Sequence, residues 1–470
     1  MVKKSKTREL LEAMSAHDQK SFRNYLDSSY FNCNTVHRQL FEILTKGLNK
    51  PELEKEAVYR EICPGKKYDD KFYRYSISGL NKHLINYYTL RHLEKDAVLN
   101  DAVAAKALSS RDCEKAFLMI HDEIENSSSH QTASLYHQKF DNAETFLTYT
   151  GNKLNRKETP DYSQTLLHLD TFYLAKKLQL SCEVANLSNI LKTNYEIALL
   201  DSLKKLASAE PFCDFPLVKI YYHILRMLTD RDADAEIHFG IVENLLKTHT
   251  DKFHPKELGE MYQYLKNYCI KKVNQGILEY LRTLFNIYGD MLANKSLMNY
   301  DYLSQWEYKN IVSISLRLNE KDWCAQFIHK YNSFLKPEER ENALAYNDSY
   351  FMFISNEYRK AIRKLQEVSL NDVFYQLDAR VILLKCYYEL EETDSFFYQA
   401  SAFRLFLLRN RHISDYQKNI YRNLIKFLTA IVRAGFSKSK LLKIQNEIEK
   451  EKNVADLNWL RTKVREAIAA

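Results

Sequence analysis

The chain has 470 residues, of which only 9 are Gly and 7 are Pro, and its formal net charge is +7. Sheets and α/β folds need frequent tight turns built from glycine and proline, so this composition excludes them and predicts an all-α protein. With 45% hydrophobic and 27% charged residues, the composition also excludes a mostly disordered chain.

The N-terminal part of the chain shows helix signals from its first residues onward. A cap at Ser15–Asp18 is expected to open a helix over Asp18–Tyr30. Thr35 is predicted to cap the next helix, and Pro51 the one that follows it. A longer helix over Asp69–Leu93 has apolar residues on more than one side, so we expect it at the centre of an N-terminal helical module.

Beyond this module the apolar pattern predicts one helix after another. The ranges 126–130 and 151–160 are the most loop-like and are expected to connect long helices. From Pro160 onward, helical periodicity returns every 12 to 20 residues. We therefore divide the chain into an N-terminal helical module (1–95), antiparallel helical hairpins (96–435) and basic C-terminal capping helices (436–470).

The later hairpins are expected to repeat with a step of 36 residues, because Ala325, Ala361 and Phe397 follow one another at that spacing after polar turns. The segment Glu357–Leu365 resembles the second helix of a tetratricopeptide repeat, with Tyr, Ala and a large apolar residue in that family's order. The resemblance is clearest over 300–410. It implies helical hairpins stacked into a right-handed superhelix.

The sequence departs from the repeat family at one signature position. The glycine that the family carries in its first helix is replaced by Ser313, Ser349 and Lys385 in the three clearest units.

Motifs for catalysis, cofactors and metals are absent from the sequence. No two glycines are closer than 13 residues, which excludes the phosphate-binding loops of nucleotide-dependent enzymes. The eight cysteines are at least 30 residues apart, so they form no zinc motif and are expected to be small buried side chains in a reducing compartment. We expect a non-enzymatic protein without cofactor or metal.

The predicted localisation rests on the N-terminal residues and on the length of the apolar runs. Glu9 and Glu12 interrupt the apolar core that an export signal would need, and no run reaches the roughly 18 residues of a membrane span. A cytoplasmic protein without a membrane partner is predicted.

The first hypothesis for function is a scaffold or adaptor that binds a peptide or protein. In tetratricopeptide-like arrays the first helix of each hairpin lines a concave groove, where a peptide binds. The resemblance therefore implies a groove lined by Tyr262, Lys266, Asn310, Arg317, Tyr346, Tyr350 and Phe353, suited to a peptide with a carboxylate and an apolar anchor. The alternative is that these rings pack between hairpins while the charged groups are solvated.

The second hypothesis is a nucleic-acid-associated regulator. Residues 1–100 carry 18 Lys and Arg against 13 Asp and Glu, and residues 411–470 carry 13 against 6, so both ends are basic. A run of cations near the C-terminus is suited to a phosphate backbone: Arg433, Lys438, Lys440 and Lys443. The alternative is that these residues form an ordinary solvated helix face.

Overall fold

The computed structural model describes residues 5–48, 54–127, 130–153, 159–191, 195–299, 302–366, 373–451 and 453–469. This part of the chain forms 23 α-helices, three short 3-10 helices and one antiparallel pair of two-residue strands. The prediction of an all-α protein is therefore confirmed. The chain divides into two compact units: unit 1 comprises residues 1–180 and 198–219, and unit 2 comprises residues 181–197 and 220–470.

Unit 1 contains ten complete helical elements and the first part of α9, together with the first residues of α11 (Pro216–Thr229). The ten complete elements and α9 are α1 (Lys6–Glu12), α2 (Ala16–Asp27), α3 (Thr35–Lys46), α4 (Lys55–Ile62), α5 (Asp70–Lys95), α6 (Ala97–Ser109), α7 (Glu114–Glu125), α8 (Ala133–Gly151), α10 (Leu200–Ala207), η1 (Phe212–Asp214) and α9 (Ser163–Leu191), which passes into unit 2 at Ser181.

The N-terminal helices begin at polar caps close to the predicted positions. Ser15 and Asp18 form a reciprocal capping box at α2, as expected from the sequence. The cap of α3 is Asn34, whose side chain accepts from the Val36 amide, so the prediction of Thr35 is wrong by one residue. Asp69 caps α5 through two backbone amides. Pro51 lies outside the described residues.

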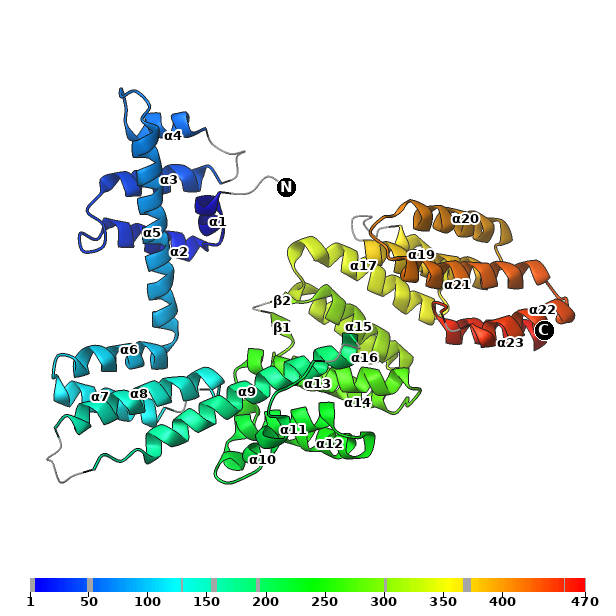
Figure 1. Cartoon of the computed structure of the whole chain (residues 1–470). Coiled ribbons are helices and arrows are strands. Elements are labelled where there is room, and N and C mark those ends of the chain that lie inside the picture. Colours follow the sequence, from blue (N-terminus) through cyan, green and yellow to red (C-terminus); the bar gives the residue numbers. More distant parts are fainter. Residues whose placement is uncertain are drawn as a thin grey trace. The chain divides into compact units, whose positions relative to one another are not determined.

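The long helix α5 forms the centre of the N-terminal helices, as predicted. Figure 1 shows α1 to α4 grouped around it. Leu80 and Leu84 of α5 are fully buried in a cluster that also contains Phe22, Leu40 and Phe41. Because α5 has buried residues on the sides facing several short helices, it holds them together.

Unit 2 contains the remaining helices and the strand pair. They are α11 (Pro216–Thr229, from Ile220), α12 (Asp232–Thr248), η2 (Thr250–Lys252), α13 (Pro255–Asn274), α14 (Tyr280–Ala293), β1 (Met298–Asn299), β2 (Tyr302–Leu303), α15 (Gln305–Arg317), α16 (Lys321–Tyr331), η3 (Asn332–Phe334), α17 (Pro337–Ile354), α18 (Tyr358–Leu365), α19 (Val373–Glu389), α20 (Thr393–Arg409), α21 (Asp415–Ala434), α22 (Lys438–Lys450) and α23 (Leu457–Ala469).

Three successive hairpins of unit 2 share one turn geometry. The turns α15–α16, α17–α18 and α19–α20 each contain one left-handed residue, namely Asn319, Asn356 and Glu391, with φ of 60°, 61° and 57°. In each turn the next amide donates to the carbonyl five residues earlier, which is the pattern of a Schellman motif. The same motif therefore ends the first helix of all three hairpins.

The shared turn corrects the predicted repeat step. The residue five positions after each left-handed residue is buried against the preceding helix: Cys324, Ala361 and Phe396. These are 37 and 35 residues apart, so the constant step of 36 placed Ala325 and Phe397 one position too late. The turn fixes the register, and the lengths of the helices between turns differ.

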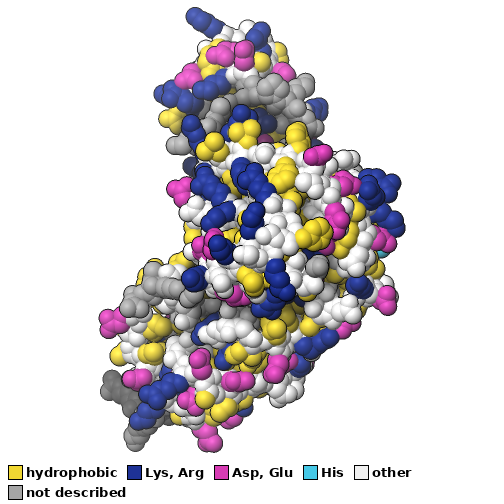
Figure 2. All heavy atoms as spheres, turned by 90° about the vertical axis from the view of Figure 1, so that its right-hand side faces the viewer, with side chains coloured by type: hydrophobic (Ala, Val, Ile, Leu, Met, Phe, Trp, Pro, Cys, Tyr) yellow, Lys and Arg dark blue, Asp and Glu magenta, His cyan; other side chains and the backbone are white. Residues whose placement is uncertain are grey.

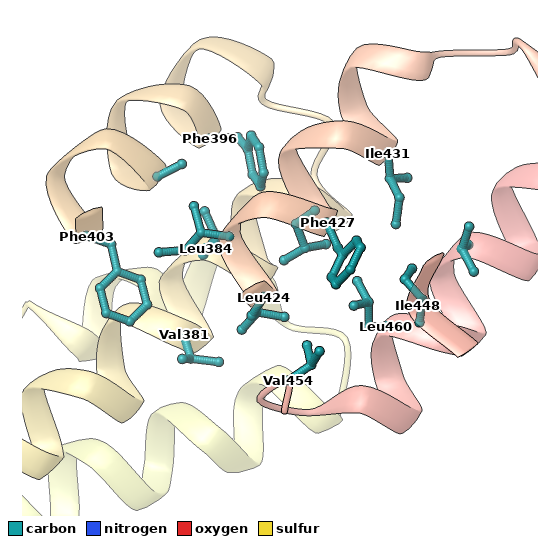
Figure 3. Close-up of a cluster of buried hydrophobic side chains, with 14 of the residues drawn as sticks. Val381, Leu384, Phe396, Phe403, Leu424, Phe427, Ile431, Ile448, Val454 and Leu460 are labelled. Atoms are coloured by element: carbon teal, nitrogen blue, oxygen red, sulfur yellow. The ribbon is translucent and has the colours of Figure 1, made fainter. Parts of the chain in front are cut away.

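The C-terminal helices of unit 2 share one hydrophobic cluster. Figure 3 shows Leu384 and Phe396 on one side of α21, and Ile448 and Leu460 on the other, with Phe427 of α21 between them. Helices α19 to α23 are thereby joined into one packed group.

The predicted domain boundaries both fall at helix junctions. Residues 95 and 96 join α5 to α6 inside unit 1, and residues 435 and 436 form the turn between α21 and α22 inside unit 2. Among the described helices, none combines the length and the apolar character needed to cross a membrane.

Four of the eight cysteines differ from the expectation of burial. Cys182, Cys269, Cys324 and Cys386 are buried, but Cys33 and Cys113 are exposed and Cys63 and Cys213 are half-buried. All eight are free thiols.

Candidate functional site

The first helices of the later hairpins lie next to one another in unit 2. Helix α15 packs against α17, and α17 packs against α19. Side chains from α15, α19 and α21 surround a cavity of about 410 Å³, which we call the anchor hollow. Its lining residues are Trp306, Lys309, Phe374, Asp378 and Tyr421.

The lining of the anchor hollow includes an ion pair surrounded by rings. The Lys309 ammonium group contacts the Asp378 carboxylate, and both side chains are about a quarter exposed. The Lys309 nitrogen also lies 5.1 to 5.7 Å from the centroids of three rings, those of Trp306, Tyr346 and Tyr375. The cation is therefore neutralised and held in place by its surroundings.

Two aromatic rings at the anchor hollow remain open to solvent. Trp306 is 38% exposed and Phe374 is 46% exposed. Their ring centroids are 6.2 Å apart and the ring planes are nearly perpendicular. Exposed aromatic pairs of this kind offer large apolar area at little loss of side-chain freedom, so they suit an apolar side chain of a ligand.

The residues predicted to line a groove divide into two groups. Asn310 and Arg317 on α15 are exposed, and Tyr350 on α17 is half-buried. Four others are buried with less than a tenth of their surface exposed: Tyr262, Lys266, Tyr346 and Phe353. The three rings of this group, Tyr262, Tyr346 and Phe353, are therefore packed between helices, as the alternative interpretation expects.

Two of the buried residues that were predicted to line a groove, Lys266 and Tyr346, instead form contacts between the first helices of successive hairpins. Lys266 of α13 forms an ion pair with Glu307 of α15, and the Tyr288 hydroxyl donates to the same carboxylate at 2.8 Å. Tyr346 of α17 packs edge-on against Tyr375 of α19, with ring centroids 5.1 Å apart.

The half-buried Tyr350 of α17 interacts with Ser313 and Arg317, which lie in the C-terminal half of α15. Burial raises the pKa of its hydroxyl to about 12, while a hydrogen bond with Ser313 and the charge of Arg317 act in the opposite direction. Tyr350 therefore stays neutral and connects α17 to the face of α15 that carries Arg317.

One face of α15 joins the anchor hollow to the predicted residues. Trp306, Asn310, Ser313 and Arg317 follow at intervals of four, three and four residues, which places them on one side of a helix. Arg317 makes no ion pair within the described part of the chain. Eleven residues separate it from Trp306, which corresponds to roughly 16 Å along the helix axis.

Sequence reasoning missed all five lining residues of the anchor hollow: Trp306, Lys309, Phe374, Asp378 and Tyr421. A signal was present, because Lys309 and Asp378 are 69 residues apart and so are Trp306 and Tyr375. A spacing of 69 residues is close to two repeat steps, so it connects residues of α15 with residues of α19. A comparison of one hairpin with the next does not reveal it.

The basic residues of the second hypothesis converge in part. Arg433, Lys440 and Lys443 line one cavity on α21 and α22, whereas Lys438 is exposed outside it. In the N-terminal helices, by contrast, Arg8, Arg23, Arg38 and Arg91 are each paired with a carboxylate.

No group of three or more His, Cys, Asp or Glu side chains suited to a metal ion occurs among the residues that the structure describes. Comparison of the chain with protein-family models, with curated proteins and with solved structures finds no match.

Proposed function

We propose that this protein is a non-enzymatic scaffold whose α15 face binds an extended segment of a partner protein. The anchor hollow would take an apolar side chain of that segment, and Arg317 would pair with a carboxylate. The observation that carries the proposal is the exposed Trp306–Phe374 pair above a Lys309–Asp378 ion pair. We propose binding and not catalysis because the charges in this cavity are already paired with each other.

The geometry of α15 defines the spacing of the partner's two groups. An extended peptide rises about 3.3 Å per residue, so the roughly 16 Å between Trp306 and Arg317 corresponds to about five residues. The partner segment should therefore carry a large apolar residue and an acidic residue or C-terminal carboxylate about five positions apart.

We also propose that the hairpins of unit 2 belong to a tetratricopeptide-like superhelix. The support is the shared Schellman turn at Asn319, Asn356 and Glu391 and the packing of α15, α17 and α19 in succession. The eight free thiols support a reducing compartment such as the cytoplasm.

Peptide display tests the proposed function. A library of random twelve-residue peptides is selected on the full chain, and the affinities of the enriched peptides are then measured by fluorescence anisotropy. Trp306→Ala and Arg317→Ala should each weaken binding by about 2 kcal/mol, because aromatic and Arg anchors dominate such contacts.

The matched control is Tyr398→Ala, which removes a ring that is 78% exposed on α20, away from the lining of the anchor hollow. This variant should bind the enriched peptides as the wild type does. Enriched peptides that bind Trp306→Ala and wild type equally would refute the proposal.

A further inference from the structure

A second cavity of unit 2 is lined by cations and by no acidic residue. It measures about 520 Å³ and lies on helices α20, α21 and α22; we call it the cationic hollow. Five of its lining residues are basic: Arg404, Lys426, Arg433, Lys440 and Lys443. Near the middle of Figure 2, which views the chain from the side of the C-terminal helices, several Lys and Arg side chains lie close together.

Most of these cations have no carboxylate to balance them. Arg433, Lys440 and Lys443 form no ion pair within the described part of the chain. Lys426 reaches Glu447 at 3.8 Å, but both side chains are well exposed, so that pair contributes little. Residues 416–446 contain seven Lys and Arg and no Asp or Glu. The hollow is therefore strongly positive.

The position of the lysines on α22 adds to this imbalance. Lys438, Lys440 and Lys443 lie in the first two turns of the helix. The N-terminal end of a helix dipole is positive, so it disfavours cations and favours a bound anion. The arrangement opposes local helix stability and favours an anionic ligand.

The turn that joins two helices of the cationic hollow carries an exposed aromatic ring. Phe436 is 93% exposed and lies between α21 and α22; in the sequence it follows the lining residue Ala434 by two positions and precedes the lining residue Lys440 by four. A ring so fully open to water gains nothing from burial in the protein. A flat apolar face next to cations is suited to stacking with an unpaired nucleic-acid base.

The helices that carry these cations are held in place by a shared hydrophobic cluster. Phe403 of α20, Ile431 of α21 and Ile448 of α22 point into the shared hydrophobic cluster shown in Figure 3. The cations on the outer surface of the same helices are thus presented from fixed backbone positions, which limits the ordering that binding requires.

We infer that the cationic hollow and Phe436 together bind single-stranded nucleic acid, with phosphates at Arg433, Lys440 and Lys443 and a base stacked on Phe436. A single strand is favoured over a duplex because only an unpaired base can stack on the ring. Binding to an anionic membrane is the competing outcome, which the vesicle measurement below distinguishes.

Fluorescence anisotropy with a labelled 20-residue oligothymidylate and the full chain tests this inference. Each phosphate contact contributes about −0.7 to the slope of log K against log salt, so three contacts give a slope near −2. The variant Lys440→Gln with Lys443→Gln should reduce that slope by about 1.4. Phe436→Ala should lower the affinity about tenfold while leaving the slope unchanged.

Matched control variants show whether binding depends on the lysines of the cationic hollow or only on the net charge of the protein. Lys252→Gln with Lys256→Gln removes two exposed lysines elsewhere in unit 2 and should bind as the wild type does. Trp306→Ala should also keep full binding, so failure of the peptide-binding proposal is distinguishable from failure of this one. Circular dichroism confirms that each variant is folded.

Four results would overturn the inference. They are equal binding by the wild type and the Lys440/Lys443 variant, unchanged affinity of Phe436→Ala, tighter binding of a duplex of the same length, and binding of phosphatidylserine vesicles without binding of the oligonucleotide.

Discussion

At the scale of single residues, the buried lysine on α13 shows how a charge is accommodated between helices. Lys266 is 2% exposed, and its ammonium group is satisfied by the Glu307 carboxylate and lies 5.0 Å from the centroid of the Tyr288 ring. Burying an unpaired charge costs several kcal/mol of folding free energy, so the buried Lys266 needs the Glu307 carboxylate as its partner. The resemblance to a tetratricopeptide array implied that Lys266 lines a groove, and the sequence carries no signal that this lysine is buried, since lysine is exposed in most proteins.

Replacing the carboxylate should therefore destabilise unit 2. We expect Glu307→Gln to cost about 3 kcal/mol, at the lower end for breaking a buried pair, because Glu307 is 24% exposed and water can reach it. The measurement is the free energy of unfolding from urea denaturation. Glu307→Gln combined with Lys266→Met removes both charges and should recover most of the loss. A double variant no more stable than Glu307→Gln would show that the ion pair is not the cause.

The cysteines provide a second prediction at this scale. Burial raises the pKa of the Cys269 and Cys386 thiols to about 12, and it also raises the pKa of Cys182 and Cys324. The thiolate is the reactive form, so these four should not react with a thiol reagent at pH 8 while the protein is folded. Exposed Cys33 and Cys113 should react within minutes.

The measurement is a timed titration with a chromogenic disulfide, followed by tryptic mapping. Addition of denaturant should release all eight thiols and serves as the control. Rapid modification of Cys182 in the folded protein would contradict the packing of α9 against α11 that the structure describes.

At the scale of helices and hairpins, the sequence predicted the elements more closely than their register. Caps such as Ser15 and Asp69 are local signals, because a side chain and its own backbone decide them. The repeat register depends on where each Schellman turn closes, and in the turns α15–α16, α17–α18 and α19–α20 the left-handed residue is Asn319, Asn356 or Glu391, so no glycine marks it. Without the glycine signal, the step of 36 could not be resolved into 37 and 35.

The candidate site was less predictable for a related reason. Periodicity identifies which residues lie on one helix face, but it does not say whether that face is solvated or covered by the next helix. Asn310 and Arg317 are exposed, whereas Tyr346 of α17 is covered by Lys309 and Tyr375. The anchor hollow arises only from three separate helices, so no single segment carries its pattern.

The packing inside one hairpin gives a prediction at this scale. Ala361 is fully buried on α18, which packs closely against α17. Ala361→Phe should overpack this contact and destabilise the protein by about 1 to 3 kcal/mol. Thermal unfolding followed by circular dichroism measures the effect.

The matched control is Lys360→Phe, which places the same ring at the neighbouring exposed position of α18. It should change stability by no more than about 0.5 kcal/mol. Equal melting temperatures for Ala361→Phe and wild type would refute the close approach of α17 and α18.

At the scale of the whole molecule, the division into two units was not accessible from the sequence. Two of the three boundaries, at residues 180 and 219, fall inside α9 and α11, where the helical pattern continues without a break; the third, at residue 197, lies between α9 and α10. Composition marks a boundary only where a linker interrupts the pattern. The all-α class, in contrast, follows from a property of the entire chain, the scarcity of Gly and Pro, and is therefore robust.

The C-terminal helices provide the prediction that concerns the molecule as a whole. Helices α22 and α23 and the segment that connects them supply five buried side chains to the cluster that also holds α19 to α21: Leu441, Ile448, Val454, Leu460 and Val464. Burying a large aliphatic side chain is worth about 1.5 to 3 kcal/mol, so the group contributes on the order of 10 kcal/mol, comparable to the stability of a domain. Deleting residues 436–470 should expose Phe427 and Ile431 and leave Lys385 without Asp456.

We expect the deletion variant to bind a hydrophobic dye and to lose hydrogen-exchange protection in α19, α20 and α21. Because α5 belongs to unit 1 whereas α22 and α23 belong to unit 2, protection of α5 should remain as in the full chain. The control is Arg465→Ala, which removes a well-exposed side chain of α23 and should leave exchange in α19 to α21 unchanged. Full protection of α21 in the deletion variant would show that α22 and α23 are dispensable, whereas loss of protection in α5 as well would show that the chain unfolds as one cooperative unit.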